Sequence, residues 1–203
     1  MLRLIPAHEY RRERWRNGLG WTREILRQPD GEDWDWRLSV AEIEADAPFS
    51  TFAGVERCFV LLHGEGLRLH LQPTAGDDDS ARVLAVEPPH GRCRFTGESD
   101  VRAELMSGPV HAFNLMWRRT RVEADLWHRP LVGSMVLFAE PGECWALFLL
   151  GGRATLGGDD TLLHLAAQDT AVIAAGNTRL RCMLDGGGEV LLIRVRNLSE
   201  QTG

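Results

Sequence analysis

The chain has 203 residues, of which 44% are hydrophobic and 26% are charged. This composition is typical of a folded globular protein and excludes a disordered one. The net charge of −6, with arginine as the only basic residue apart from histidine, argues against a nucleic-acid partner. No run approaches the roughly 20 apolar residues that span a bilayer, and residues 1–6 lack a signal-peptide pattern. We therefore expect a cytoplasmic protein without a membrane partner.

Strand patterns begin at the N-terminus. Residues 1–6 predict a short edge strand that ends at a proline, and the polar residues 8–14 predict a connector. Residues 15–21 place two tryptophans around a glycine turn, and alternation resumes from Thr22. In residues 36–41, Trp36, Leu38 and Val40 alternate with polar or small residues, as on a strand. A buried strand follows at residues 58–62, after a turn at residues 48–54.

The second half of the chain continues as strands. Residues 111–118 alternate again, residues 121–128 and 132–139 predict two separate strands, and residues 189–196 predict a buried one. An internal echo aligns residues 82–105 with residues 161–184, which indicates a duplicated β-unit. Almost no segment has the 3.6-residue apolar period of a helix. Many short strands with glycine turns predict an all-β sandwich or barrel.

Metal-binding and nucleophilic patterns are weak. The four cysteines are isolated, which argues against a structural zinc site and favours free thiols. None of the seven histidines has the His-x-His spacing of metal sites. Two residues after His70, where a second ligand would stand, the chain has Gln72. We therefore expect no metal and no other cofactor, although two histidines and a carboxylate from distant strands could still converge. Neither Ser39 nor Ser50 has the context of a serine nucleophile.

Four motifs in order resemble the HutD/Ves family. They are W-R-N-G-L-G-W-T-R-E-I (residues 15–25), W-R-L-S-V-A (residues 36–41), P-F-S-T-F-A-G-V-E-R (residues 48–57) and F-N-L-M (residues 113–116). Together they are specific, whereas none of them is specific alone. One departure is Leu19, where the family commonly has glycine.

The resemblance implies a fold, a pathway and a ligand class. The fold is a double-stranded β-helix of the cupin superfamily (an RmlC-like jelly-roll barrel), duplicated as a bicupin, with one unit at residues 1–120 and a smaller one at residues 121–203. The family is bacterial, is linked to histidine utilisation and has no established catalytic activity. It is thought to bind a small acidic metabolite such as urocanate or formylglutamate and to restrain the pathway.

The polar strand faces supply the candidate binding site. If the motif strands line one barrel, their inward residues gather in an interior too polar for a packing core. Arg37 is the expected carboxylate anchor, because a guanidinium offers a bidentate fork. The full set of expected ligand-binding residues is Trp15, Asn17, Thr22, Glu24, Arg37, Ser39, Phe49, Ser50, Arg57, Asn114 and Met116.

Alternatives remain for both the arginines and the function. Arg37 and Glu24 could pair across adjacent strands and only fill the barrel, and Arg57 could satisfy carbonyl groups of residues 48–54. The preferred function is non-catalytic, metal-free binding of a small acidic metabolite. The alternatives are a cupin enzyme acting on a small organic acid and a protein–protein regulator with a vestigial pocket. A homodimer through exposed strands is one assembly that such a fold allows.

Overall fold

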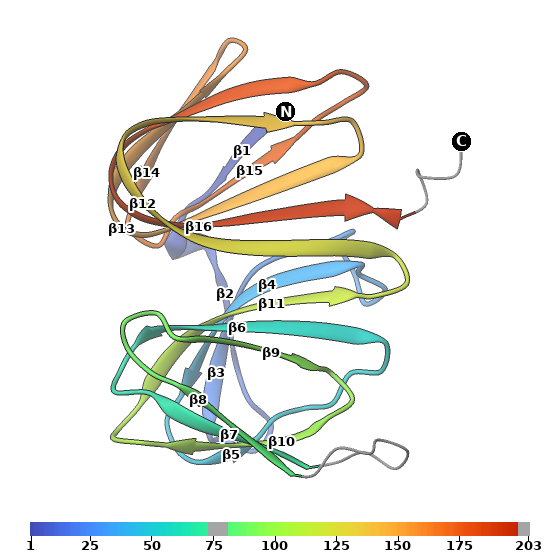
Figure 1. The fold of residues 1–203 in the computed structure, drawn as a ribbon, viewed down its shortest axis with the longest axis vertical. Helices are drawn as coiled ribbons and strands as arrows, with labels where there is room; N and C mark the ends of the chain where they lie inside the picture. Colours follow the sequence, from blue (N-terminus) through green and yellow to red (C-terminus); the bar gives the residue numbers. More distant parts are fainter. Residues whose placement is uncertain (73–80, 199–203) are drawn as a thin grey trace. The chain divides into compact units, whose positions relative to one another are not determined.

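The computed structural model describes residues 1–72 and 81–198 and is all-β apart from one 3-10 turn, η1 (Ala7–Glu9) (Figure 1). Contacts divide the chain into two compact units. We call Arg11–Thr120 the motif unit, because all four motifs lie in it. We call Met1–Tyr10 together with the chain from Arg121 on the terminal unit. None of the helices in the described ranges is long and apolar enough to cross a membrane.

The motif unit consists of two antiparallel sheets. The larger has the order β2-β3-β4-β11-β6-β9 and the smaller the order β5-β10-β7-β8. The larger sheet's strands are β2 (Arg11–Arg14), β3 (Gly20–Gln28), β4 (Trp36–Ile43), β11 (Val110–Arg118), β6 (Val55–His63) and β9 (Arg92–Thr96). The smaller sheet's strands are β5 (Ala47–Pro48), β10 (Asp100–Leu105), β7 (Leu67–Gln72) and β8 (Arg82–Val86).

An apolar core joins the inner faces of these two sheets. Leu67 and Leu69 on β7 and Ala103 on β10 are fully buried and belong to the same cluster as Phe59 of β6. Alternation places every second residue of β7 and β10 in this core and the others outside, as the period of two requires. The core fills one end of the space between the sheets, and polar residues occupy the inner face elsewhere.

One strongly curved sheet forms the terminal unit (Figure 1). Its order is β1-β15-β13-β16-β12, with β14 paired to β13. The strands are β1 (Leu2–Ile5), β12 (Val122–Ala139), β13 (Glu143–Gly158), β14 (Thr161–Ala166), β15 (Thr170–Ala174) and β16 (Leu180–Asn197). The three longest strands bend, and an apolar cluster that includes Leu147, Leu156 and Leu184 fills the curve.

Glycines make the bend possible. Gly152 of β13 has φ +92°, and a Cβ there would lie 1.9 Å from the carbonyl oxygen of Gly187 on β16. Gly188 has φ +130° and meets the carbonyl oxygen of Gly151 equally closely. Only glycine tolerates such backbone approach at positive φ, and glycines are the usual means of curving a sheet.

Two local expectations differ from the structure. Residues 8–14 are not merely a connector, since η1 is followed by the edge strand β2. The predicted strands at residues 121–128 and 132–139 are one strand, β12, which includes Pro130. Proline is tolerated there because β12 is the edge strand of its sheet and needs no further ladder donor.

The expected unit boundaries also differ at the N-terminus. Leu2–Ile5 pairs with β15 in antiparallel register, and the terminal amine donates to the carbonyl of Ala174 at 2.7 Å. Tyr10 Oη contacts Thr170 Oγ1 at 2.7 Å. The first ten residues therefore belong with the C-terminal half of the chain and not with residues 11–120.

Candidate functional site

A cavity of about 640 Å³ lies in the motif unit and is lined mainly by its motif residues. Its floor consists of neighbouring positions on β4, β11 and β6. Arg37 is opposite Met116, which is opposite Arg57, and the next inward row is Ser39, Asn114 and Phe59. The turn before β3 and the segment after β5 supply the remaining walls. The lining residues are Glu13, Arg14, Trp15, Arg16, Asn17, Thr22, Arg37, Ser39, Ala41, Pro48, Phe49, Ser50, Phe52, Arg57, Phe59, Asn114 and Met116.

Most of the residues expected from the sequence come together in this cavity. Glu24 alone among them is not part of the wall. The residues that do line it are Trp15, Asn17, Thr22, Arg37, Ser39, Phe49, Ser50, Arg57, Asn114 and Met116. Strand alternation identified the floor because the period of two puts Arg37 and Ser39 on one face. That these residues bind a ligand stays a prediction.

Several lining residues were not among those expected from the sequence. Glu13, Arg14 and Arg16 lie in or beside β2, which was expected to be a connector. Phe59 belongs to a strand that was treated only as core, and Ala41 shares the face of Arg37 and Ser39 but is apolar. The charge pattern R-R-E-R of β2, followed by Trp15, was the available signal. Alternating charges of both signs suit an exposed edge strand next to a polar mouth.

Arg37 is already paired within the protein. Its Nε lies 2.8 Å from Oε2 of Glu24, and both side chains are largely buried. Glu24 also accepts from Arg27, at 3.0 Å from Nε and 2.5 Å from Nη2. Burial alone would raise the pKa of Glu24, but the Arg27 hydrogen bond and the charges of Arg37, Arg27 and Arg11 lower it. The carboxylate is therefore ionised and neutralises much of the Arg37 charge.

Arg57 is a buried cation of the site that has no acidic partner among the described residues. Its side chain is buried, with 7% of the residue exposed, and within the described ranges no carboxylate lies within 4 Å of it. Its hydrogen bond is a long one of 3.4 Å from Nη1 to the carbonyl oxygen of Ser50, and its Nε has no partner among the described residues. Burial lowers the pKa of Arg57 to about 10. At neutral pH it is therefore a buried charge that has no counter-ion among the described residues.

Aromatic rings surround this guanidinium. Its Cζ lies 5.1 Å from the ring centroid of Phe49, 6.0 Å from that of Phe52 and 5.0 Å from that of Phe95. Cation–π contacts of this kind offset part of the desolvation cost, but they cannot replace a carboxylate. The arrangement leaves Arg57 able to bind an anion that enters the cavity.

An amide and a second arginine add to this pattern. Asn114, 6% exposed, has a buried Oδ1 without a partner in the part of the chain that the structure describes. A buried acceptor left unpaired costs about 1–3 kcal/mol, so it favours a ligand that donates a hydrogen bond. Arg16 is exposed and forms no ion pair with the described residues, whereas Arg14 is paired with Glu44 at 2.6 Å.

The mouth of the cavity is held by defined contacts. Trp15 donates from Nε1 to Oγ1 of Thr22 at 2.9 Å and packs edge-on against Phe49, with centroids 6.1 Å apart. Oε1 of Glu98 accepts from the amide of Gly54 at 2.6 Å and from Arg119 at 2.7 Å. Hydrogen bonds from Arg119 and from Gly54 lower the pKa of Glu98 to about 2. The segment that carries Phe49 and Ser50 is thereby anchored.

The described cavity wall contains few side chains that bind metals and no thiol. No histidine or cysteine is among the described residues that line it. The cysteines are free, and burial raises the pKa of Cys58 to about 11 and those of Cys93 and Cys144 to about 12. Such thiols are protonated at neutral pH and are poor nucleophiles.

Structural comparisons agree with a cupin-like fold. An oxalate decarboxylase from Lactobacillus farciminis aligns with a TM-score of 0.68 at 8% identity, over 95% of this chain and 85% of that one. HutD from Pseudomonas fluorescens aligns with a TM-score of 0.78 at 26% identity, over 97% of this chain and 99% of that one. The expected all-β, cupin-like class is thus confirmed, and the finer description as two closed barrels is taken up below.

Sequence comparisons give the family. A Pseudomonas putida protein of 21.2 kDa, described as lying in the region 3′ of hutC, is 41% identical over 62% of this chain. The protein Ves of Cronobacter sakazakii is 37% identical over 55% of it. The matched stretches span 63% and 58% of those two relatives. The HutD family model matches residues 7–192, and the chain therefore belongs to the HutD family.

Proposed function

We propose that the cavity of the motif unit binds a small organic acid, with its carboxylate on Arg57. The observation that carries the proposal is that Arg57 is buried, charged and without an acidic partner among the described residues. A guanidinium binds a carboxylate through two parallel hydrogen bonds, and such pairs are strongest where water is excluded. An incoming carboxylate would replace the missing counter-ion. Arg37 is the weaker candidate because Glu24 already occupies it.

Other polar groups of the wall limit the chemical classes of ligand that would suit the cavity. Asn114 Oδ1 favours a ligand with an N–H or O–H donor, and Arg16 offers a second positive charge at the exposed part of the wall. Aromatic side chains give the apolar lining that small-molecule sites usually have. Urocanate has one carboxylate and a ring N–H, and formylglutamate has two carboxylates and an amide N–H. Relatives named for hut regions support this choice of histidine-degradation metabolites.

We further propose that the protein is non-catalytic, uses no metal and acts in the cytoplasm to modulate histidine utilisation, without a nucleic-acid or membrane partner. The metal-free part is supported by the lack of histidine and cysteine in the described wall.

We also propose that the chain is a bicupin, with one cupin-like domain in each unit. Residues 82–105 contain β8, β9 and β10, and the similar residues 161–184 contain β14, β15 and the start of β16. The two stretches thus hold three successive strands each, in separate units.

Thermal-shift measurements with urocanate, formylglutamate, formiminoglutamate and glutamate test the proposal. A ligand that binds only the folded state at 100 times its Kd stabilises by about 2.7 kcal/mol, and hence raises the melting temperature. We expect at least one acid to do so in the wild type. No shift at millimolar concentration with any of the four would overturn the proposed function.

The Asn114→Leu variant tests whether the ligand donates a hydrogen bond to this side chain. It removes the unpaired acceptor without touching either arginine, so the apo fold should be no less stable. Binding of an acid with an N–H donor should weaken roughly 5- to 150-fold, the equivalent of one buried hydrogen bond. An acid of the same length without the donor should be affected little. Equal losses for both acids would contradict the role of Asn114.

A further inference from the structure

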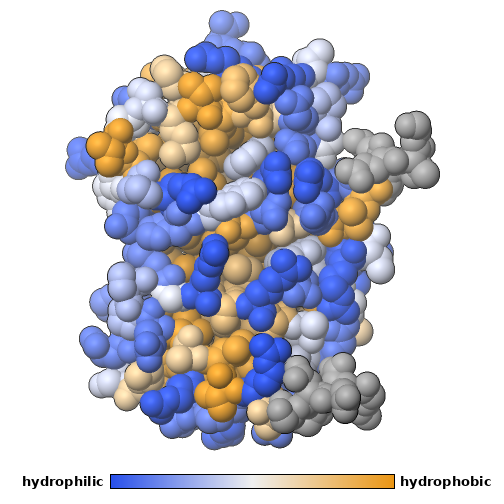
Figure 2. All heavy atoms as spheres, viewed as in Figure 1, coloured by the Kyte–Doolittle hydropathy of each residue, from blue (hydrophilic) through white to orange (hydrophobic). Residues whose placement is uncertain are grey.

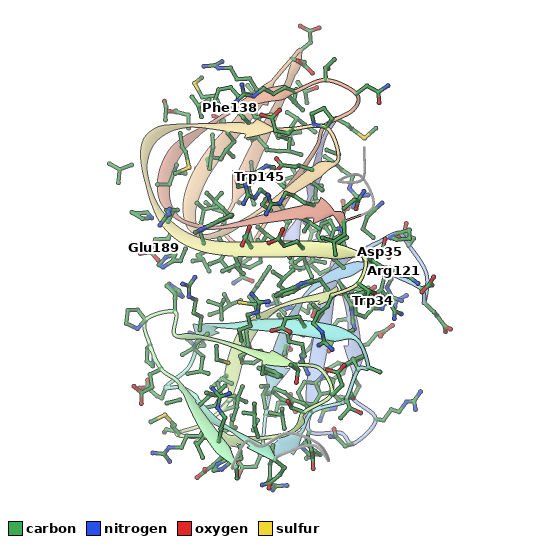
Figure 3. All side chains as sticks on the ribbon, turned by 45° about the vertical axis from the view of Figure 1, so that its right-hand side comes forward. Trp34, Asp35, Arg121, Phe138, Trp145 and Glu189 are labelled. Carbon is green, nitrogen blue, oxygen red and sulfur yellow. The ribbon has the colours of Figure 1, made fainter. Side chains whose placement is uncertain are left out.

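The outer face of the terminal unit carries an exposed apolar row across four strands. Val136 of β12 pairs with Met183 of β16, which pairs with Gly157 of β13, which pairs with Leu162 of β14. The three side chains are 42%, 44% and 60% exposed. Phe138, labelled in Figure 3, lies two residues further along β12 and is covered by Arg179, whose Cζ is 4.0 Å from the ring centroid. Figure 2 shows apolar residues bordered by polar ones on the face that it draws, whereas in this row every strand contributes an apolar side chain or a glycine.

A hollow interrupts this row at Gly157. The glycine has no side chain between Met183 and Leu162, and the hollow there has a volume of about 460 Å³. It is lined by Gly157, Gly158, Asp159, Asp160, Thr161, Leu162, Arg181 and Met183. The face therefore presents a protruding methionine directly beside a space that can receive one.

Unpaired charges flank the hollow. Arg181, on β16, and the two aspartates Asp159 and Asp160, at the β13–β14 turn, are exposed. Within the described residues none of the three forms an ion pair, although they line the same hollow. Positive charge is thus on the β16 side of the row, and negative charge is on the β13–β14 side.

We propose that this face binds a second copy of the chain across a two-fold axis. An axis parallel to the strands and between β16 and β13 exchanges the two sides of the row. Met183 of one copy then enters the hollow at Gly157 of the other, and Val136 meets Leu162. Arg181 of each copy meets Asp159 and Asp160 of the other. The same two-fold rotation matches shape, apolar surface and charge between the two copies. An isologous interface requires such a self-complementary surface.

Sedimentation equilibrium of the full chain tests this proposal. We expect the wild type to be a dimer at concentrations of roughly 100 µM, and Leu162→Asp to raise the dissociation constant by about a hundredfold or more, because it buries an unpaired carboxylate. Val132→Asp is the matched control. Val132 is 91% exposed on the same strand as Val136, but its row contains Gly187 and Arg153 and is outside the proposed contact. A monomeric wild type, or equal effects of the two variants, would overturn the proposal.

Two further variants distinguish loss of dimerisation from loss of the folded monomer. A Cβ on Gly157 would lie at an ordinary 3.6 Å from Leu162 Cδ1, so Gly157→Gln fills the hollow without disturbing the monomer. We expect it to abolish dimerisation with an unchanged melting transition of the monomer. Arg181→Asp should weaken the dimer, and the additional changes Asp159→Arg and Asp160→Arg should restore it. Failure of this charge exchange to restore any association, with Leu162→Asp still dissociating the dimer, would show a different symmetry and overturn the proposed axis.

Discussion

Replacing Arg57 by methionine should stabilise the protein in the absence of ligand. Methionine keeps the length of the side chain and removes the charge. Burial lowers the pKa of Arg57 from its ordinary value to about 10. A lowering of this size corresponds to about 3 kcal/mol by which folding disfavours the charged form. Since the folded pKa is the lower one, this penalty is fully present below about pH 10 and disappears as the pH rises toward the ordinary pKa of arginine.

Other contacts of Arg57 reduce the expected gain. The guanidinium lies over three phenylalanine rings and donates one long hydrogen bond to Ser50, and these contacts are lost in the variant. They contribute about 1–2 kcal/mol together. A net gain of about 1–2 kcal/mol remains at neutral pH, which corresponds to a rise in Tm of roughly 2–8 °C for a chain of this length.

Differential scanning calorimetry of the apo protein checks this prediction, with Arg37→Met as the matched control. Burial lowers the pKa of Arg37 too, but this arginine is paired with Glu24 at 2.8 Å, and its loss leaves that buried carboxylate with Arg27 as its main partner. Breaking the buried pair should lower stability by about 1–2 kcal/mol. The two arginine variants should thus shift Tm in opposite directions. A decrease of similar size in both would refute the reasoning that Arg57 is an uncompensated charge.

Two further predictions concern the mouth of the cavity and the bend of the terminal unit. Glu98→Gln should lower the Tm at neutral pH, since the depressed pKa of Glu98, about 2, contributes stability that is present above its ordinary value and lost as pH falls toward 2. Melting curves of both proteins between roughly pH 2 and pH 7 should converge at the acid end, and a constant difference would contradict the role of the carboxylate. Gly152→Ala should destabilise by more than about 3 kcal/mol, because its Cβ would lie 1.9 Å from the Gly187 carbonyl oxygen at positive φ. Gly151→Ala, with nothing within 4 Å of the added Cβ, should cost less than about 1 kcal/mol in urea unfolding, and equal losses would contradict the close-approach explanation.

The sequence predicts the cavity floor well because alternation is a local property. Arg37 and Ser39 share one face of their strand, and Asn114 and Met116 one face of theirs, whatever the rest of the chain does. The structure then places the two pairs in adjacent rows. The class of fold follows for the same reason, from many short alternating runs.

The relative importance of the two arginines could not be predicted in this way. Whether Arg37 or Arg57 is free depends on where Glu24 lies, and β3 has a bulge between Glu24 and Leu26 that no local pattern reveals. The sequence favoured Arg37 as the anchor, whereas in the structure Arg37 has an acidic partner and Arg57 has none among the described residues. The pairing of Leu2–Ile5 with β15 is equally a long-range property.

Ligand affinity at Arg57 tests the central claim most directly. Isothermal titration calorimetry with the acid that gives the largest thermal shift would compare the wild type, Arg57→Met and Arg37→Met. Loss of a buried charge pair corresponds to roughly 2–5 kcal/mol, or about 30- to 5,000-fold in Kd. We expect Arg57→Met to weaken binding by this amount while the apo protein becomes more stable, and Arg37→Met to weaken it much less. Unchanged affinity in Arg57→Met would contradict the assignment of Arg57 as the carboxylate anchor.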